Sequence, residues 1–159
     1  MILVLLGTQS HSFIRLLDEI EDCIENKIIL EPVITQHGHT LFSSKHMTLF
    51  DFISIEEFNE LIDHADLIIT HGGVGSIINS IKTGKKVIAV PRLAEFNEHI
   101  NDHQVQIVET FDKLGLIQGV FDVKEICKNI KNIDNFTPTP YVSNNQGMLE
   151  IVSNYINNN

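Results

Sequence analysis

The pattern of hydrophobic and polar positions alternates between short apolar runs and helical stripes. Residues 2–6 form a continuous apolar run that ends at Gly7-Thr8, which is typical of a strand covered on both faces. From Ser12 onward, apolar residues recur every three or four positions, which predicts a helix. The same alternation then returns along the chain, so the sequence predicts a parallel sheet whose strands are connected by helices.

The later segments extend this pattern. We expect strands at 28–34, 66–70 and 86–91, and helices at 56–64, 74–83, 99–114 and 123–130. Residues 134–147 contain Pro and Asn and are interpreted as a connection, and residues 148–156 as a closing helix. Right-handed crossovers between such elements give a single Rossmann-like, doubly wound parallel sheet with helices on both faces, an α/β fold.

Composition limits the size and the partners of the protein. The 159 residues suit one domain, 1–159, in which 134–159 is a looser C-terminal extension that ends in a helix. Eleven Lys and Arg against 21 Asp and Glu give a net charge of −10, and no basic stretch is present, so nucleic acid is not an expected partner. The apolar opening is too short to span a membrane and follows no basic region, so we expect a soluble protein without an export signal.

The two cysteines offer little chemistry by their spacing. Cys23 and Cys127 lie far apart in helical patterns, so they form neither a CxxC redox pair nor a zinc knuckle. We expect them to be buried, reduced thiols of a cytoplasmic protein.

The strongest local motif is Thr-His-Gly-Gly-Val-Gly-Ser at 70–76, between a buried strand and an amphipathic helix. Its glycines allow a ligand to approach the backbone, and the free amides at the helix start favour an anion such as phosphate. His71 and Ser76 would add side-chain donors. The alternative is a turn whose glycines only let the helix pack closely on the strand. The Walker pattern is excluded, because it requires Gly-Lys at the start of a helix and Gly84-Lys85 lies at the end of one. The dinucleotide-binding pattern GxGxxG is excluded, because Ile78 stands where its third glycine would be.

Two other segments follow strands of the expected sheet. The turn at 7–12 contains hydroxyl groups that either cap the next helix or bind a second phosphate, so the two turns could hold a diphosphate together. The segment 91–104 contains His99 and His103 at the spacing of a zinc site, but Ile100 replaces the expected glutamate and no third ligand is apparent. Its Asn, Asp, His and Gln side chains suit the hydroxyls of a sugar, or else a solvated helix start.

These segments together resemble one family. The Gly-Thr turn after the first strand, the segment 65–76, and Pro91-Arg92 followed by Glu98-His99 and Asn-Asp-His-Gln at 101–104 resemble the C-terminal, donor-binding domain of glycosyltransferase family 28, one half of a GT-B fold. The resemblance runs from residue 2 to about residue 119. More narrowly, the chain is similar to stand-alone halves of bipartite UDP-sugar transferases, in bacterial capsule and exopolysaccharide synthesis and in dolichol-linked GlcNAc transfer.

The resemblance implies a set of ligand-binding residues. Those expected to hold the donor diphosphate are His71, Gly73, Gly75 and Ser76, with Gly7, Thr8 and Gln9 from the first turn. Those expected to bind the transferred sugar are Asp102 and Gln104. Asn79 stands where many relatives have a carboxylate that binds the ribose, and residues 36–38 fall where a loop approaches the base.

The resemblance also implies a function. The chain would be the UDP-sugar-binding catalytic subunit of an inverting glycosyltransferase, with His71 as the catalytic residue that stabilises the departing UDP, and with no metal or other cofactor. The acceptor would be a lipid-linked sugar held by a membrane-anchored acceptor-binding subunit, because 159 residues are too few for both halves of a GT-B enzyme. The chain would then be cytoplasmic, at the inner face of the membrane through its partner.

Two alternatives remain open at this point. A non-catalytic nucleotide-sugar-binding module would use the same two turns but would never support transfer. A self-sufficient nucleotide-sugar epimerase or hydrolase would need its own acid and base, for which His99, Asp102 and His103 are the only clustered candidates. Turnover by the purified chain alone would favour the self-sufficient enzyme, whereas turnover only after an acceptor subunit is added would favour the transferase half.

Overall fold

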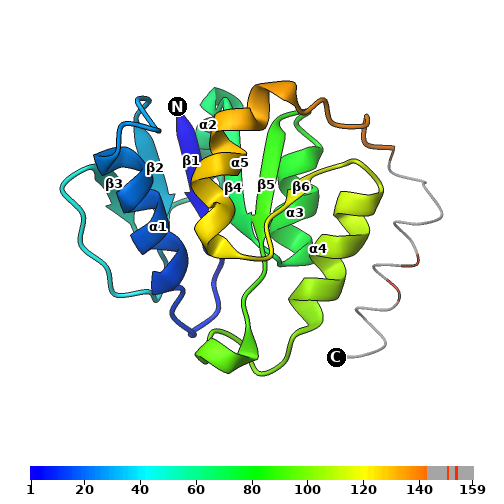
Figure 1. Cartoon of the computed structure of the whole chain (residues 1–159), viewed down its shortest axis with the longest axis horizontal. Coiled ribbons are helices and arrows are strands. Elements are labelled where there is room, and N and C mark those ends of the chain that lie inside the picture. Colours follow the sequence, from blue (N-terminus) through cyan, green and yellow to red (C-terminus); the bar gives the residue numbers. More distant parts are fainter. Residues whose placement is uncertain (143–149, 151–152, 154–159) are drawn as a thin grey trace.

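The computed structural model describes residues 1–142, 150 and 153, and its centre is a parallel sheet of six strands (Figure 1). The strands are β1 (Ile2–Leu5), β2 (Val33–Gln36), β3 (Met47–Phe50), β4 (Leu67–His71), β5 (Lys86–Val90) and β6 (Gln118–Gly119). Their order is β3-β2-β1-β4-β5-β6, so the direction of winding reverses between β1 and β4. The predicted doubly wound sheet is confirmed, and its ligand site is expected outside this switch point.

Helices connect the strands. They are α1 (Ile14–Glu25), α2 (Ile55–His64), α3 (Val74–Ile81), α4 (His103–Lys113) and α5 (Ile126–Asn132), with short 3-10 turns at Ala94–Phe96, Val123–Glu125 and Ile133–Asn135. Ser54 and Glu57 form a capping box that fixes the start of α2. None of the helices in the described residues is long and apolar enough to cross a membrane.

Two hydrophobic cores hold the layers together, one on each face of the sheet. Because side chains alternate along a strand, Ile2 and Val4 of β1 face α1 and α5, whereas Leu3 and Leu5 face the side covered by α2, α3 and α4. All four side chains are at most 4% exposed. The uninterrupted apolar run therefore reflects a strand that is buried on both faces.

Two expected elements begin later than predicted, and two edge strands were not predicted. The strand expected at 28–34 begins only at Val33, because the amides of Ile28 and Ile29 both donate to the Cys23 carbonyl and close the end of α1. The helix expected at 99–114 begins at His103. The edge strands β3 and β6 were not expected at all. The closing helix expected at 148–156 lies almost wholly outside the described residues.

The expectation of two separate reduced thiols is wrong. Cys23 of α1 and Cys127 of α5 form a disulfide, with Cα atoms 5.5 Å apart and 104 residues between them along the chain. Both helices cover the same face of the sheet and pack side by side (Figure 1). Distance along the sequence therefore gave no information about this pair, since the crossovers bring α5 back onto α1.

Candidate functional site

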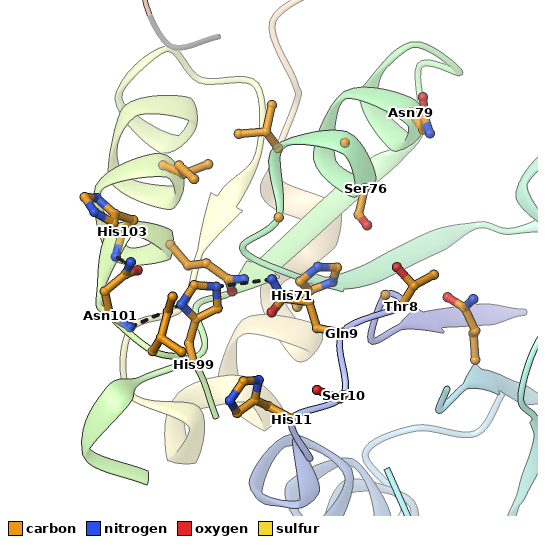
Figure 2. Close-up of a pocket in the computed structure, with 18 of the residues that line it drawn as sticks. Thr8, Gln9, Ser10, His11, His71, Ser76, Asn79, His99, Asn101 and His103 are labelled. Atoms are coloured by element: carbon orange, nitrogen blue, oxygen red, sulfur yellow. Dashed lines mark hydrogen bonds between the residues drawn. The ribbon is translucent and has the colours of Figure 1, made fainter. Parts of the chain in front are cut away.

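A cavity of about 630 Å³ opens at the carboxyl edge of the sheet, at the switch point between β1 and β4 (Figure 2). The loop after β1, the turn after β4 and the start of α4 meet around it. Because β1 and β4 are direct neighbours, with Leu5 opposite Thr70, the two turns that follow them lie next to each other. The structure thus brings together the two glycine-containing turns that the sequence places 64 residues apart, from Gly7 to His71.

His71 occupies the floor of this pocket. It ends β4, is 6% exposed, and its Nδ1 lies 3.3 Å from the carbonyl oxygen of Leu5. A Cβ atom at Gly7 or at Gly73 would collide with the imidazole ring. These two glycines are therefore required by the packing of His71 itself, and not only by the approach of a ligand.

The other two glycines of the motif differ in their surroundings. A Cβ at Gly72 would lie 2.8 Å from the Cβ of Gln104 and 2.9 Å from Val108 Cγ2, so Gly72 lets α4 pack against the turn. A Cβ at Gly75 would meet nothing within 4 Å, and Gly75 lines the pocket. Gly75 is thus the one glycine of this motif whose missing side chain leaves space for a ligand.

The start of α3 supplies positive potential. Gly73 precedes the helix and has no side chain to cap it, and the first backbone bond runs from Ile77 N to Gly73 O at 3.0 Å. The amides of Val74, Gly75 and Ser76 therefore have no partner within the helix, and these residues line the pocket. Such amides, with the positive end of the helix dipole, favour an anion.

His71 is neutral at neutral pH. Burial, and next the positive charge of Arg92, lower the pKa of His71 to about 4, against a smaller opposite effect of the Leu5 carbonyl. With the ring neutral, the contact to the carbonyl oxygen requires a proton on Nδ1, which donates to Leu5. The Nε2 atom is then an acceptor until the ring takes up a second proton.

The first turn and the segment before α4 touch across the pocket (Figure 2). The side-chain nitrogen of Gln9 lies 3.3 Å from Nε2 of His99. The backbone amide of Asn101 donates to Nδ1 of the same ring. The rings of His11 and His99 stack with their centroids 6.4 Å apart. Burial is also the main cause that lowers the pKa of His99. The sequence had not assigned His11 or Asn101 to the site, although both lie in segments that it had singled out.

The remaining predicted residues divide into two groups. Thr8, Ser76, Asn79 and Gln104 all line the pocket. Asp102 does not line it, because its Oδ1 accepts the Ala94 amide at 2.9 Å and holds the segment that precedes α4. The structure therefore does not bring Asp102 together with the other expected sugar-binding residue.

The loop expected near the base contributes a single residue. Gln36, at the end of β2, lines the pocket. His37 instead turns away, with Nε2 2.8 Å from Asp51 Oδ1 and Nδ1 bonded to the Thr40 carbonyl. Phe58 of α2, which no sequence motif had marked, also lines the cavity.

Possible metal ligands gather elsewhere. Within the part of the chain that the structure describes, one group of three side chains has ligand atoms within 4.8 Å of one another, namely Glu21, Glu25 and His46. None of these residues lines the pocket. His99 and His103 both line it, but no such group includes either of them among the described residues.

Solved structures with the same fold match this chain either with less than half of a glycosyltransferase or with almost their whole length. The glycotransferase of kitacinnamycin matches 95% of this chain with 38% of its own, at 14% identity and a TM-score of 0.61. MurG of Acinetobacter baumannii matches 94% of this chain with 44% of its own, at 14% identity and a TM-score of 0.56. A solution structure of ALG13 matches 94% of this chain with 93% of its own, at 16% identity and a TM-score of 0.59. The chain has the fold of one half of a GT-B glycosyltransferase.

The family follows from the sequence match. The chain belongs to the glycosyltransferase family 28 C-terminal domain family, whose model matches residues 1–156. Similar curated proteins include the UDP-N-acetylglucosamine transferase subunit ALG13 of Candida albicans, 30% identical over 98 residues that make up 62% of this chain and 32% of the relative. The same subunit of Saccharomyces cerevisiae is 36% identical over 85 residues, 52% of this chain and 39% of the relative. The match therefore spans less than half the length of either relative.

Proposed function

We propose that this chain is the UDP-sugar-binding catalytic subunit of an inverting glycosyltransferase. It would move a hexose or HexNAc onto a lipid-linked acceptor in polysaccharide or glycan biosynthesis, and GlcNAc is the sugar we favour. The observation that carries the proposal is the anion-favouring pocket at the β1–β4 switch point of a family 28 chain. The name of the ALG13 relatives, UDP-N-acetylglucosamine transferase subunit, supports both the donor and the need for a second subunit.

The pocket suggests how a UDP-sugar would lie. The diphosphate would rest on the amides at the start of α3, between Ser76 and the first turn with Thr8 and Gln9. Asn79, further along α3, would reach the ribose, and Gln36 would lie near the base. Gln104, whose Oε1 accepts the Arg92 amide at 3.1 Å, keeps its NH₂ group for the hydroxyls of the transferred sugar.

The chemistry follows from this placement. The acceptor hydroxyl oxygen would attack the anomeric carbon while the bond from that carbon to the β-phosphate oxygen breaks, and the bonding electrons leave with UDP. Amides at the helix start would stabilise the charge that develops on the leaving group, so no metal ion is part of the proposal. His71 would add a donor once Nε2 is protonated, which a nearby diphosphate favours because an anion raises the pKa of an imidazole.

The proposal includes a membrane-anchored partner that holds the acceptor and supplies the general base. The chain would lie in the cytoplasm, at the inner face of the membrane. Whether the product is a capsule, another exopolysaccharide or a protein-linked glycan depends on that acceptor.

Calorimetric titration with UDP tests the donor site. We expect UDP to bind the wild-type protein, and His71→Ala to weaken binding by about tenfold or more, in line with the loss of a charge-assisted contact. His64→Ala is the matched control, because His64 is exposed on α2 and outside the pocket lining, and it should leave the affinity unchanged. A wild-type protein that does not bind UDP would contradict the proposed function.

Transfer assays separate the alternatives. Labelled UDP-GlcNAc should give labelled lipid only when the chain is combined with membranes that contain the acceptor subunit. Turnover by the purified chain alone would favour a self-sufficient enzyme. Tight UDP binding with no transfer in any combination would favour a non-catalytic module.

A further inference from the structure

Among the described residues, Arg92 is the largest side chain that is almost completely buried, at 1% exposed. Its guanidinium donates to three backbone carbonyls, with Nη2 2.8 Å from Leu6 O, and Nη1 2.5 Å from His11 O and 3.3 Å from Glu98 O. It also lies over the ring of Phe13, 5.0 Å from its centroid. The carbonyls of Leu6 and His11 bracket the loop 7–10, every residue of which lines the pocket.

This buried cation has no carboxylate of its own. In the described residues, no Asp or Glu oxygen lies within 4.0 Å of the Arg92 guanidinium, and its Nε atom has no hydrogen-bond partner. The nearby Glu98 carboxylate is bidentate to Arg15, at 2.8 and 2.9 Å, and also accepts the Leu93 amide. The charge of Glu98 also acts on Arg92, where it opposes the lowering of the Arg92 pKa by burial. Arg15 and Arg92 thus share one carboxylate, which leaves one positive charge of this cluster unbalanced. A buried charge without a counterion is costly for the folded state.

The pocket itself carries no fixed charge. Among the residues that the structure describes, the lining contains no Asp, Glu, Lys or Arg, and its titratable groups are four histidines, namely His11, His71, His99 and His103. The protein as a whole has a net charge of −10 and would repel an anion at long range. The field of Arg92 does reach the pocket, since its charge lowers the pKa of His71 and of His99.

We propose that Arg92 is the built-in countercharge of the ligand: from behind the loop 7–10 it both positions that loop and balances the negative charge of a bound diphosphate, without touching it. The inference rests on the proposed binding of a UDP-sugar in this pocket. Arg92 is thus a positioning residue that acts through the loop and through its field. An anionic ligand would complete the charge balance that the free protein lacks.

The test is a ligand series of increasing negative charge, uridine, UMP and UDP, titrated into wild type and Arg92→Met. If Arg92 acts by its charge, the loss of affinity should be graded: less than about threefold for uridine, and about tenfold or more for UDP, because interaction energy scales with ligand charge. A misplaced loop would also weaken UDP more than uridine, because Thr8 and Gln9 lie on the diphosphate side of the pocket, so Arg92→Lys is needed to separate the charge from the loop geometry. An equal loss for uridine, UMP and UDP would overturn the proposal.

Two further variants control for structural damage. Arg92→Lys keeps the charge but not the three-carbonyl geometry, so it should retain the wild-type ratio of UDP to uridine affinity. The double variant R15M/E98Q removes one positive and one negative charge from the neighbouring pair, and it should also retain that ratio. If neither Met nor Lys at position 92 gives a folded chain, or if Arg92→Lys loses the ratio, the role of Arg92 is structural alone.

Failure of this inference is distinguishable from failure of the proposed function. A wild-type protein that binds none of the three ligands contradicts the UDP-sugar site, and the countercharge with it. A wild-type protein that binds UDP more tightly than uridine, and keeps that preference in Arg92→Met, contradicts the countercharge only.

Discussion

At the scale of single residues, His71 has two roles, because its ring packs against two glycines and is also buried in its neutral form. It fills the space left by Gly7 and Gly73, and its Nδ1 donates to the Leu5 carbonyl. Burial and the charge of Arg92 hold the ring neutral in the folded protein. A neutral, buried imidazole resists protonation, whereas the same side chain in the unfolded chain does not. The stability of the protein must therefore depend on pH.

We expect the free energy of unfolding to decrease as the pH falls from about 6.5 to about 4. The pKa of His71 is about 4 in the folded protein against 6.5 for an ordinary histidine, so acid favours the unfolded chain over this range. The contribution of this residue is about 3 kcal/mol at most. Urea unfolding of wild type and His71→Asn at several pH values measures it. Parallel pH profiles for the two proteins would show that His71 does not carry this dependence.

The sequence predicts the position of a pocket residue well where its motif follows a strand, and poorly where the position depends on which side chains are buried. Gly7, Thr8, Gln9 and the residues of the β4–α3 turn lie together because neighbouring parallel strands end at one edge. Asp102 lies outside the pocket because its carboxylate is used by a local backbone amide, which no spacing rule reveals. The burial of Arg92 was equally invisible, since arginine is normally an exposed residue.

At the scale of elements, the start of α3 combines stability and binding in one position. Gly75 lies in the first turn of this helix, where its backbone conformation is helical and a Cβ would meet nothing within 4 Å. A glycine in a helix is less favourable than an alanine, and here the vacant space belongs to the pocket.

Gly75→Ala should therefore stabilise the fold while weakening UDP binding. We expect a gain of about 0.5 kcal/mol in the free energy of unfolding, from the reduced freedom of the unfolded chain. The new methyl group would occupy the space assigned to the diphosphate and reduce the affinity. Thermal unfolding and calorimetry on the same preparation give both values. A variant that binds UDP as tightly as wild type would place the diphosphate elsewhere.

The long elements were predictable and the short ones were not. Helices with a clear apolar stripe, such as α1 and α3, and the doubly buried strands β1, β4 and β5 follow directly from periodicity. The edge strand β3 has a partly exposed face and lacks an apolar run, and β6 has only two residues. The run at 28–34 was apolar for another reason, because Ile29 enters the core beside the end of α1 without joining a strand.

At the scale of the whole molecule, the disulfide between Cys23 and Cys127 connects α1 to α5. It links two helices that already share one core, on the face of the sheet formed by α1 and α5. The pocket residues lie between the two cysteines or just before the first of them. The crosslink therefore limits the unfolded chain more than it shapes the site.

Removing the crosslink should lower stability and leave the ligand site intact. We expect the double variant C23A/C127A to lose about 4 kcal/mol in the free energy of unfolding, since the disulfide spans 104 residues, with UDP affinity within about twofold of wild type. Chemical denaturation with and without a reducing agent measures the loss. A reducing agent should destabilise the wild type and leave the double variant unchanged, whereas equal effects on both would argue against a formed disulfide.

The same crosslink determines what a protease would leave behind. The loop between β2 and β3 carries Leu41, which is 87% exposed, and this loop falls between the two cysteines along the chain. A single cut there would separate the backbone into two pieces, each holding one half of the disulfide. The nicked molecule would remain one covalent species, with β1 and β4 still paired, until a reductant released its fragments.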